Sequence, residues 1–136
     1  SLPGNLPQFW DGAGWSSDMQ DIAPIGTEWE APLGNSFSVI PHPGGGWLLT
    51  SCSLFGPDVG AWHSDALTGP FTYLGSIFTI VSEVPGQWQY GGQAFIASNG
   101  KLRICYSTYP NNNALTRADY TAYGVRWAEV DVPARP

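Results

Sequence analysis

Residues 36–54 read SFSVIPHPGGGWLLTSCSL, and the fold class follows from the pattern of these residues. Apolar and polar side chains alternate over 36–41 and again over 47–54, which is the pattern of half-buried β-strands. The HPGGG segment at 42–46 supplies the proline and glycines that a tight reversal of the chain needs. The stretch therefore predicts an antiparallel β-hairpin.

Two more segments extend this hairpin along the chain. The same alternation returns over 59–64 (VGAWHS) and 71–78 (FTYLGSIF), with a loop at 65–70 between them. Apolar residues at helical spacing are absent, and the 17 glycines and 12 prolines are scattered along the chain, which excludes long helices. We therefore expect a four-stranded antiparallel meander in an all-β protein.

A second unit repeats this pattern. Its predicted strands are 92–97, 101–108 and 125–132, and the Ser-Asn-Gly turn at 98–100 joins the first two. Aligning Gly46 with Gly100, an offset of 54 positions, superposes GGWLLTSCS on NGKLRICYS. A weak repeat of four-stranded units is typical of β-propeller blades.

The repeat divides the chain into three parts. Residues 1–33 are expected to supply only the outer strands of an incomplete blade, through 9–15 and 22–25, whereas 34–82 and 83–136 are each expected to form a full blade. A propeller ring needs at least about four blades. Two and a half blades would leave apolar faces in water, so we expect a partner chain or self-association to complete the fold.

Charge and hydropathy exclude several classes of partner. Eleven acidic residues against five basic ones give a net charge of −6, so nucleic acid is not an expected partner. No apolar run approaches the roughly 18 residues of a membrane span. The start of the chain, SLPG, lacks a Met and a charged leader, which suggests a processed, secreted protein. No spacing matches a metal signature, and no cofactor is expected.

Several segments carry a resemblance to a known family. They are FWDGAGWSSD from residue 9, NSFSVIPHPGGGWLLTSC from 35, AWHSDALTGPF from 61, YGGQAFI from 90, LRICYS from 102 and YGVRWAEVDV from 123. Together they resemble the C-terminal part of secreted five-bladed β-propeller proteins of poorly defined function, which are similar in architecture to arabinanase-type glycoside hydrolases. The resemblance implies that the remaining blades lie on another chain, cut from the same precursor or supplied by copies of this one.

In a propeller the first strand of each blade lines the central channel, where ligands bind. This places Asn35 and Ser36 of one blade, and Tyr90 and Gln93 of the next, at the channel as candidate ligand-binding residues. Glycoside hydrolysis needs a pair of carboxylates, and neither strand start supplies one. No catalytic residue is therefore assigned.

Carboxylates near a channel mouth could come only from loops. Asp11 and Glu83 are the nearest such groups in the sequence. Asp11 more readily caps the glycine-rich turn that follows it. We therefore keep Asp11 as a candidate ligand-binding residue and not as a catalytic one.

Three of the seven tryptophans lie in loop-like contexts and are candidates for sugar contact. Trp10, Trp15 and Trp88 have Gly, Gln or Asp neighbours, whereas the others are expected to be packing residues between blades. An indole ring packs on the C–H face of a pyranose while amides bond its hydroxyls. The alternative for these three is also structural packing.

His63, Ser64 and Asp65 have the residue types of a catalytic triad, but alternation puts His63 and Ser64 on opposite faces of a strand. His63 is therefore expected to make a structural hydrogen bond. His42 lies in the proline-flanked turn and is expected to be exposed to solvent.

The two cysteines allow a disulfide. At an offset of 54 positions, Cys52 and Cys105 point to opposite faces of equivalent strands, and adjacent blades meet through opposite faces. The two sulfurs are therefore expected to face each other across the interface as a disulfide or as two buried thiols. A link from one of them to a separate chain is the alternative.

Three functions follow from this sequence. The first is carbohydrate binding without catalysis at the channel mouth. The second is half of a glycoside hydrolase whose carboxylates lie mainly in the missing blades. The third is the small subunit of a two-chain protein similar to fungal immunomodulatory glycoproteins, although no Asn-x-Ser/Thr acceptor occurs in this chain.

Overall fold

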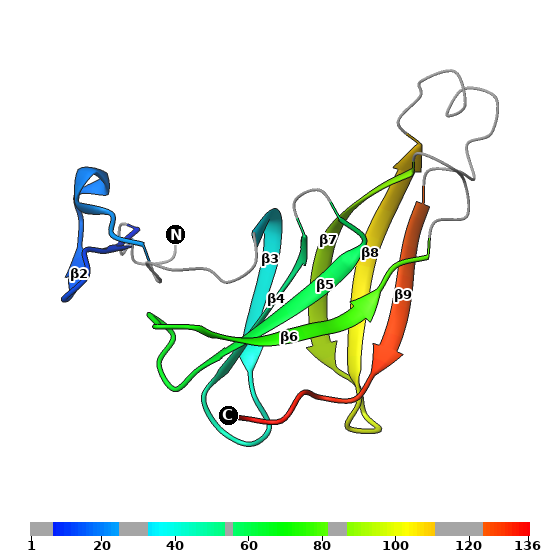
Figure 1. Cartoon of the computed structure of the whole chain (residues 1–136). Coiled ribbons are helices and arrows are strands. Elements are labelled where there is room, and N and C mark those ends of the chain that lie inside the picture. Colours follow the sequence, from blue (N-terminus) through cyan, green and yellow to red (C-terminus); the bar gives the residue numbers. More distant parts are fainter. Residues whose placement is uncertain (1–6, 25–32, 54–55, 82–86, 111–123) are drawn as a thin grey trace, which may run out of the picture.

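The computed structural model describes residues 7–24, 33–53, 56–81, 87–110 and 124–136, with the exception of the Asn35 side chain (Figure 1). The described chain is all-β, with three antiparallel sheets and one short 3-10 helix. No helix in these ranges is long and apolar enough to cross a membrane. The elements are β1 (Phe9–Trp10), β2 (Trp15–Ser16), η1 (Met19–Asp21), β3 (Leu33–Pro41), β4 (Trp47–Ser53), β5 (Asp58–Ser64), β6 (Thr72–Thr79), β7 (Gln87–Ile96), β8 (Leu102–Pro110) and β9 (Gly124–Val130).

Strands β3 to β6 form the predicted meander. They lie side by side in chain order, and every neighbouring pair is antiparallel. Pro41 pairs with Trp47, so residues 42–46 form the turn that the HPGGG segment predicts. This part of the all-β expectation is confirmed.

Strands β7, β8 and β9 form a second antiparallel sheet. Ile96 pairs with Leu102, and this pairing closes a turn at residues 97–101. The sheet has three strands within the described residues, where a full blade would have four. None of the described sheets closes on itself.

The N-terminal part differs from the expected pair of outer strands. Its hairpin lies entirely within residues 9–16, because Phe9 pairs with Ser16 and Trp10 with Trp15. Residues 22–24 form no strand, and Ile25 lies outside the described ranges. The Gly-rich residues 11–14 (DGAG) form the turn of this hairpin. Figure 1 shows the hairpin apart from the two larger sheets.

The two larger sheets pack on each other through β7, which lies against β3 and β4. The hydroxyl of Thr50 donates to the backbone oxygen of Gly92 at 2.7 Å, and the backbone N–H of Ala94 donates to the hydroxyl of Ser38 at 2.8 Å. Gly92 approaches β4 so closely that a Cβ atom there would lie 2.6 Å from the backbone nitrogen of Cys52. The core between the sheets contains Leu48, Cys52, Val59, Ala61, Ile80, Ala94, Leu102 and Ile104.

The turns of the two sheets correct the offset of the repeat. In the first turn the N–H of His42 donates to the carbonyl of Gly46, and the N–H of Gly45 donates to the carbonyl of His42. In the second turn the N–H of Ala97 donates to the carbonyl of Lys101, and the N–H of Gly100 donates to the carbonyl of Ala97. Gly45 and Gly100 both have a positive φ, 97° and 79°. The repeat therefore has an offset of 55 positions, one more than the sequence alignment predicts.

A shift of one position in the alignment exchanges the two faces of a strand, because successive side chains point to opposite sides. On β4, Leu48 and Cys52 point into the core between the sheets, whereas their equivalents on β8, Arg103 and Ser107, lie on the side away from it. The two sheets thus meet through opposite faces of equivalent strands. That is the relationship expected between successive units of a repeat.

Candidate functional site

A hollow of about 240 Å³ lies where β3 meets the second sheet. All four strands β3, β7, β8 and β9 contribute to it, through Ser36, Tyr90, Gly91, Gln93, Cys105, Tyr106, Ser107 and Val125. Three of the residues predicted to lie at the channel, Ser36, Tyr90 and Gln93, are therefore brought together in space. The side chain of Asn35, the fourth, lies outside the described part of the chain.

A β-bulge in β7 gives this hollow its polar and aromatic lining. The pairing with β8 shifts between Gly91 and Gln93, and Gly91 and Gly92 have φ values of 102° and 76°. Glycine tolerates this left-handed backbone, which L side chains rarely adopt. The extra residue turns Gln93 to the same face as Tyr90, although their spacing would put them on opposite faces of a regular strand.

Three aromatic rings line one edge of this face. Trp88 and Tyr90 both contact the ring of Tyr109 edge-on, with centroid distances of 5.8 and 5.9 Å. The side chain of Trp88 is about half exposed. Trp88 therefore joins the site through Tyr109, a residue that the sequence did not single out. The even spacing of Tyr109 from Cys105 and Ser107 puts the three side chains on one face of β8. Only the pairing of β8 with β7 shows that this is the face with Tyr90 and Gln93.

Among the described residues that line the hollow there is no carboxylate. Glu83 lies outside the described ranges. Asp11 lies in the N-terminal hairpin, where its Oδ1 accepts from the backbone N–H groups of Ala13 and Gly14 at 2.8 and 2.6 Å. These two bonds hold the pKa of Asp11 below its ordinary value. The turn-capping role predicted for Asp11 is confirmed.

The other tryptophan candidates occupy a second place, the N-terminal hairpin. Trp10 and Trp15 pair across the two strands, and their rings meet edge-on at 5.7 Å. Trp15 is more than half exposed. The predicted site residues thus divide between this hairpin and the hollow on the second sheet.

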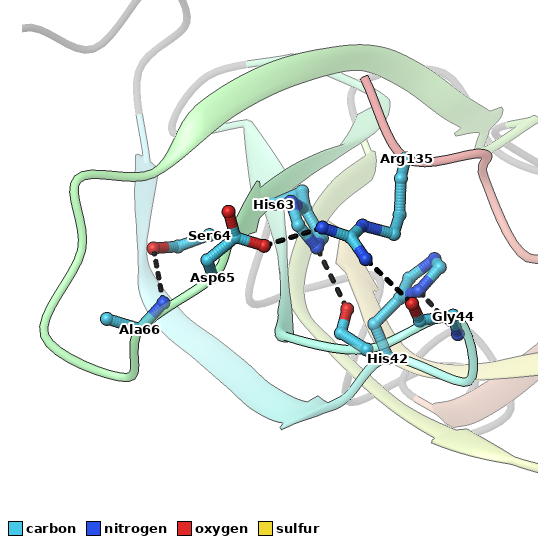
Figure 2. A network of polar contacts seen from close by, with 8 residues as sticks. His42, Gly44, His63, Ser64, Asp65, Ala66 and Arg135 are labelled. Carbon is cyan, nitrogen blue, oxygen red and sulfur yellow. Dashed lines mark hydrogen bonds and ion pairs between the residues drawn. The ribbon is translucent and has the colours of Figure 1, made fainter.

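The residues of the apparent triad serve structural roles (Figure 2). The Nε2 of His63 lies 3.1 Å from the carbonyl oxygen of Gly45, to which it must donate, and this confirms the predicted structural hydrogen bond. The hydroxyl of Ser64 accepts from the backbone of Ala66, and Asp65 pairs with Arg135 at 2.7 Å.

His42 is buried, and the expectation that it is exposed was wrong. Its Nε2 bonds to the carbonyl oxygen of Pro133. Arg135 bonds to the neighbouring backbone oxygen of Gly44, as Figure 2 shows. The C-terminal segment therefore covers the turn. Alternation and turn composition gave no sign of this contact, because the partners lie far apart in the sequence.

Of the disulfide and the pair of thiols that the sequence left open, the structure shows two free thiols and no disulfide between Cys52 and Cys105. Cys52 is buried in the core between the sheets, and burial raises its pKa to about 11. Cys105 pairs with Gln93 and Trp127 on the other face of the second sheet. The expectation that the two sulfurs face each other failed because the repeat offset was one position too short.

Within the described ranges, no group of three or more His, Cys, Asp or Glu side chains is placed to hold a metal ion. Comparison with known proteins found no matching family model, curated protein or solved structure. The propeller family therefore remains an expectation from the sequence resemblance.

Proposed function

We propose that this chain binds a carbohydrate, without catalysing its hydrolysis, in the hollow between β3 and the second sheet. The observation that supports this is the convergence of Tyr90, the exposed amide of Gln93 and the hydroxyls of Ser36 and Ser107 on one hollow. An aromatic ring offers a flat apolar surface to a sugar ring, and amides and hydroxyls both donate to and accept from sugar hydroxyls.

The size of the hollow limits the ligand. Its volume of about 240 Å³ is below the roughly 300–1,000 Å³ of pockets that enclose drug-sized molecules. It would accommodate one pyranose unit. The aromatic edge formed by Trp88 and Tyr109 extends from it and could support a second unit of the same glycan.

The proposal places the chain in a secreted protein of β-propeller type, completed by a second chain of the same precursor or by copies of itself. Its support is the four-stranded meander and the packing of successive sheets through opposite faces. The glycoside hydrolase alternative would require both catalytic carboxylates to come from elsewhere, because the described lining of the hollow holds none.

Glycan-array screening of the purified chain, followed by calorimetry with the best ligand, tests the proposal. Replacing the exposed Gln93 with Ala should weaken binding at least tenfold, because the sugar hydroxyls lose their amide partner. The matched control is Gln20→Ala, which removes another exposed glutamine, in η1, and should bind like the wild type. The variant Trp15→Ala tests whether the glycan binds at the N-terminal hairpin instead.

Two results would overturn the proposal. One is the absence of binding to any glycan on the array. The other is binding that Trp15→Ala abolishes and Gln93→Ala leaves unchanged, which would move the site to the N-terminal hairpin.

A further inference from the structure

The second sheet exposes a broad apolar face on the side away from the core. Four large side chains of this face are between 46% and 71% exposed, namely Trp88, Phe95, Val125 and Trp127. They lie on β7 and β9, with Arg103, Cys105 and Ser107 of β8 between them. Monomeric proteins rarely leave so many large apolar side chains side by side in water, and such patches mark interaction surfaces.

The internal repeat indicates what kind of surface this is. With the offset of 55 positions and the strand pairings, Trp127 is equivalent to Ala61 and Val125 is equivalent to Val59. Ala61 and Val59 are fully buried, because the second sheet packs on them. The exposed face is therefore the counterpart of a face that, in the first unit, is covered by another β-sheet.

The charges on this face favour a second copy of the same chain. Arg103 lies over the ring of Trp127 at 4.6 Å and pairs with Glu129 at 2.9 Å. At the same end of the sheet Lys101 pairs with Asp131. Each positive charge here has its own negative partner, although the whole chain carries −6. Two copies can thus approach through this face without the like-charge repulsion that the rest of their surface would cause.

We propose that this exposed face of the β7–β8–β9 sheet docks on the same face of a second copy of this chain, so that the two copies associate through their second sheets. Phe95, Trp127 and Val125 would be buried in this contact. Cys105, Ser107 and Val125 also line the hollow, so the second copy would cover part of the proposed ligand site. The association does not depend on the hollow binding a carbohydrate.

Sedimentation velocity of the purified chain, from micromolar to near-millimolar concentration, tests this surface. The wild type should shift with concentration from 14.7 kDa to twice that mass. Phe95→Glu should weaken the association roughly tenfold or more, because it puts a carboxylate into the buried apolar contact. Arg103, whose guanidinium lies 6.0 Å from the Phe95 ring, can pair with the new carboxylate, so the fold should be retained.

The matched control is Phe37→Glu. Phe37 is 50% exposed, lies on β3, the strand equivalent to β7, and belongs to the other sheet. This variant carries the same change of charge and should associate like the wild type. As a second measurement, alkylation of Cys105 should slow when the wild type is concentrated, and it should not slow for Phe95→Glu.

A wild type that stays at 14.7 kDa over the whole range would overturn the proposal. Equal weakening by Phe95→Glu and Phe37→Glu would also overturn it, because the contact would then not lie on this face. Circular dichroism spectra of both variants, compared with the wild type, exclude unfolding as the cause.

Discussion

The Nε2 atom of His42 lies 2.9 Å from the carbonyl oxygen of Pro133, which is 91 positions further along the chain. The Nδ1 atom of the same ring accepts from the backbone N–H of Gly44 at 3.0 Å, so the hydrogen must be on Nε2. The ring is buried, with both nitrogens bonded. His42 thus ties the first hairpin turn to the C-terminal segment.

His42→Ala should lower the free energy of unfolding by about 1–3 kcal/mol, because the partly buried carbonyl of Pro133 and the backbone N–H of Gly44 lose their partner. Arg135→Ala removes a bond to the same turn, but Arg135 and Asp65 are largely exposed, so its cost should stay within about 1 kcal/mol. Urea unfolding of both variants measures the difference. Equal effects would contradict the structural role assigned to His42.

Gly92→Ala should destabilise the protein more than Gly100→Ala. The two glycines have nearly the same φ, 76° and 79°, so the conformational cost of a side chain, about 1–2 kcal/mol, is common to both. Only at Gly92 would the new Cβ also collide with the backbone of Cys52, whereas the space around Gly100 is open. We expect a further cost of about 1–3 kcal/mol from this collision. Thermal unfolding of the pair tests the close contact between the two sheets.

The two thiols should differ in reactivity. Iodoacetamide at mildly alkaline pH should alkylate Cys105 in the folded protein and leave Cys52 unmodified, because Cys52 is buried and its pKa is raised to about 11. Mass spectrometry should find one added group in the native protein and two in urea without a reductant. Cys105→Ser should add none in the native state. If urea released no thiol until a reductant was added, a disulfide would be present after all.

The pKa of Glu129 should lie below the ordinary glutamate value of about 4.3. Hydrogen bonds from Arg103 and then from Asn99 to its carboxylate lower it. Because the pKa is lower in the folded than in the unfolded state, the carboxylate stabilises the fold above the unfolded value, and this contribution is lost as the pH falls through the lowered pKa. NMR titration of Glu129 measures the pKa, and Arg103→Gln should raise it. A titration curve that Arg103→Gln leaves in place would show that the ion pair does not form in solution.

Local sequence patterns predicted the strands well. Strand β3 begins three residues before its predicted start and β7 begins five before, and the other five strands of the two larger sheets begin within one residue of theirs. The extension of β7 contains Trp88 and the bulge at Gly91 and Gly92, which no alternation pattern could reveal. The bulge decides the lining of the hollow, because it brings Gln93 to the face of Tyr90.

The all-β class, the order of the meander and the turn at Asp11 follow from the sequence, since they depend on neighbouring residues. Which face of each strand is buried depends on the packing of the two sheets. Side chains alternate with a period of two, so an alignment that is wrong by one position, as it was at Gly46 and Gly100, exchanges the inner and outer faces and separates Cys52 from Cys105. The burial of His42 likewise depends on its contact with Pro133 of the C-terminal segment, because only folding brings these two residues, 91 positions apart, together.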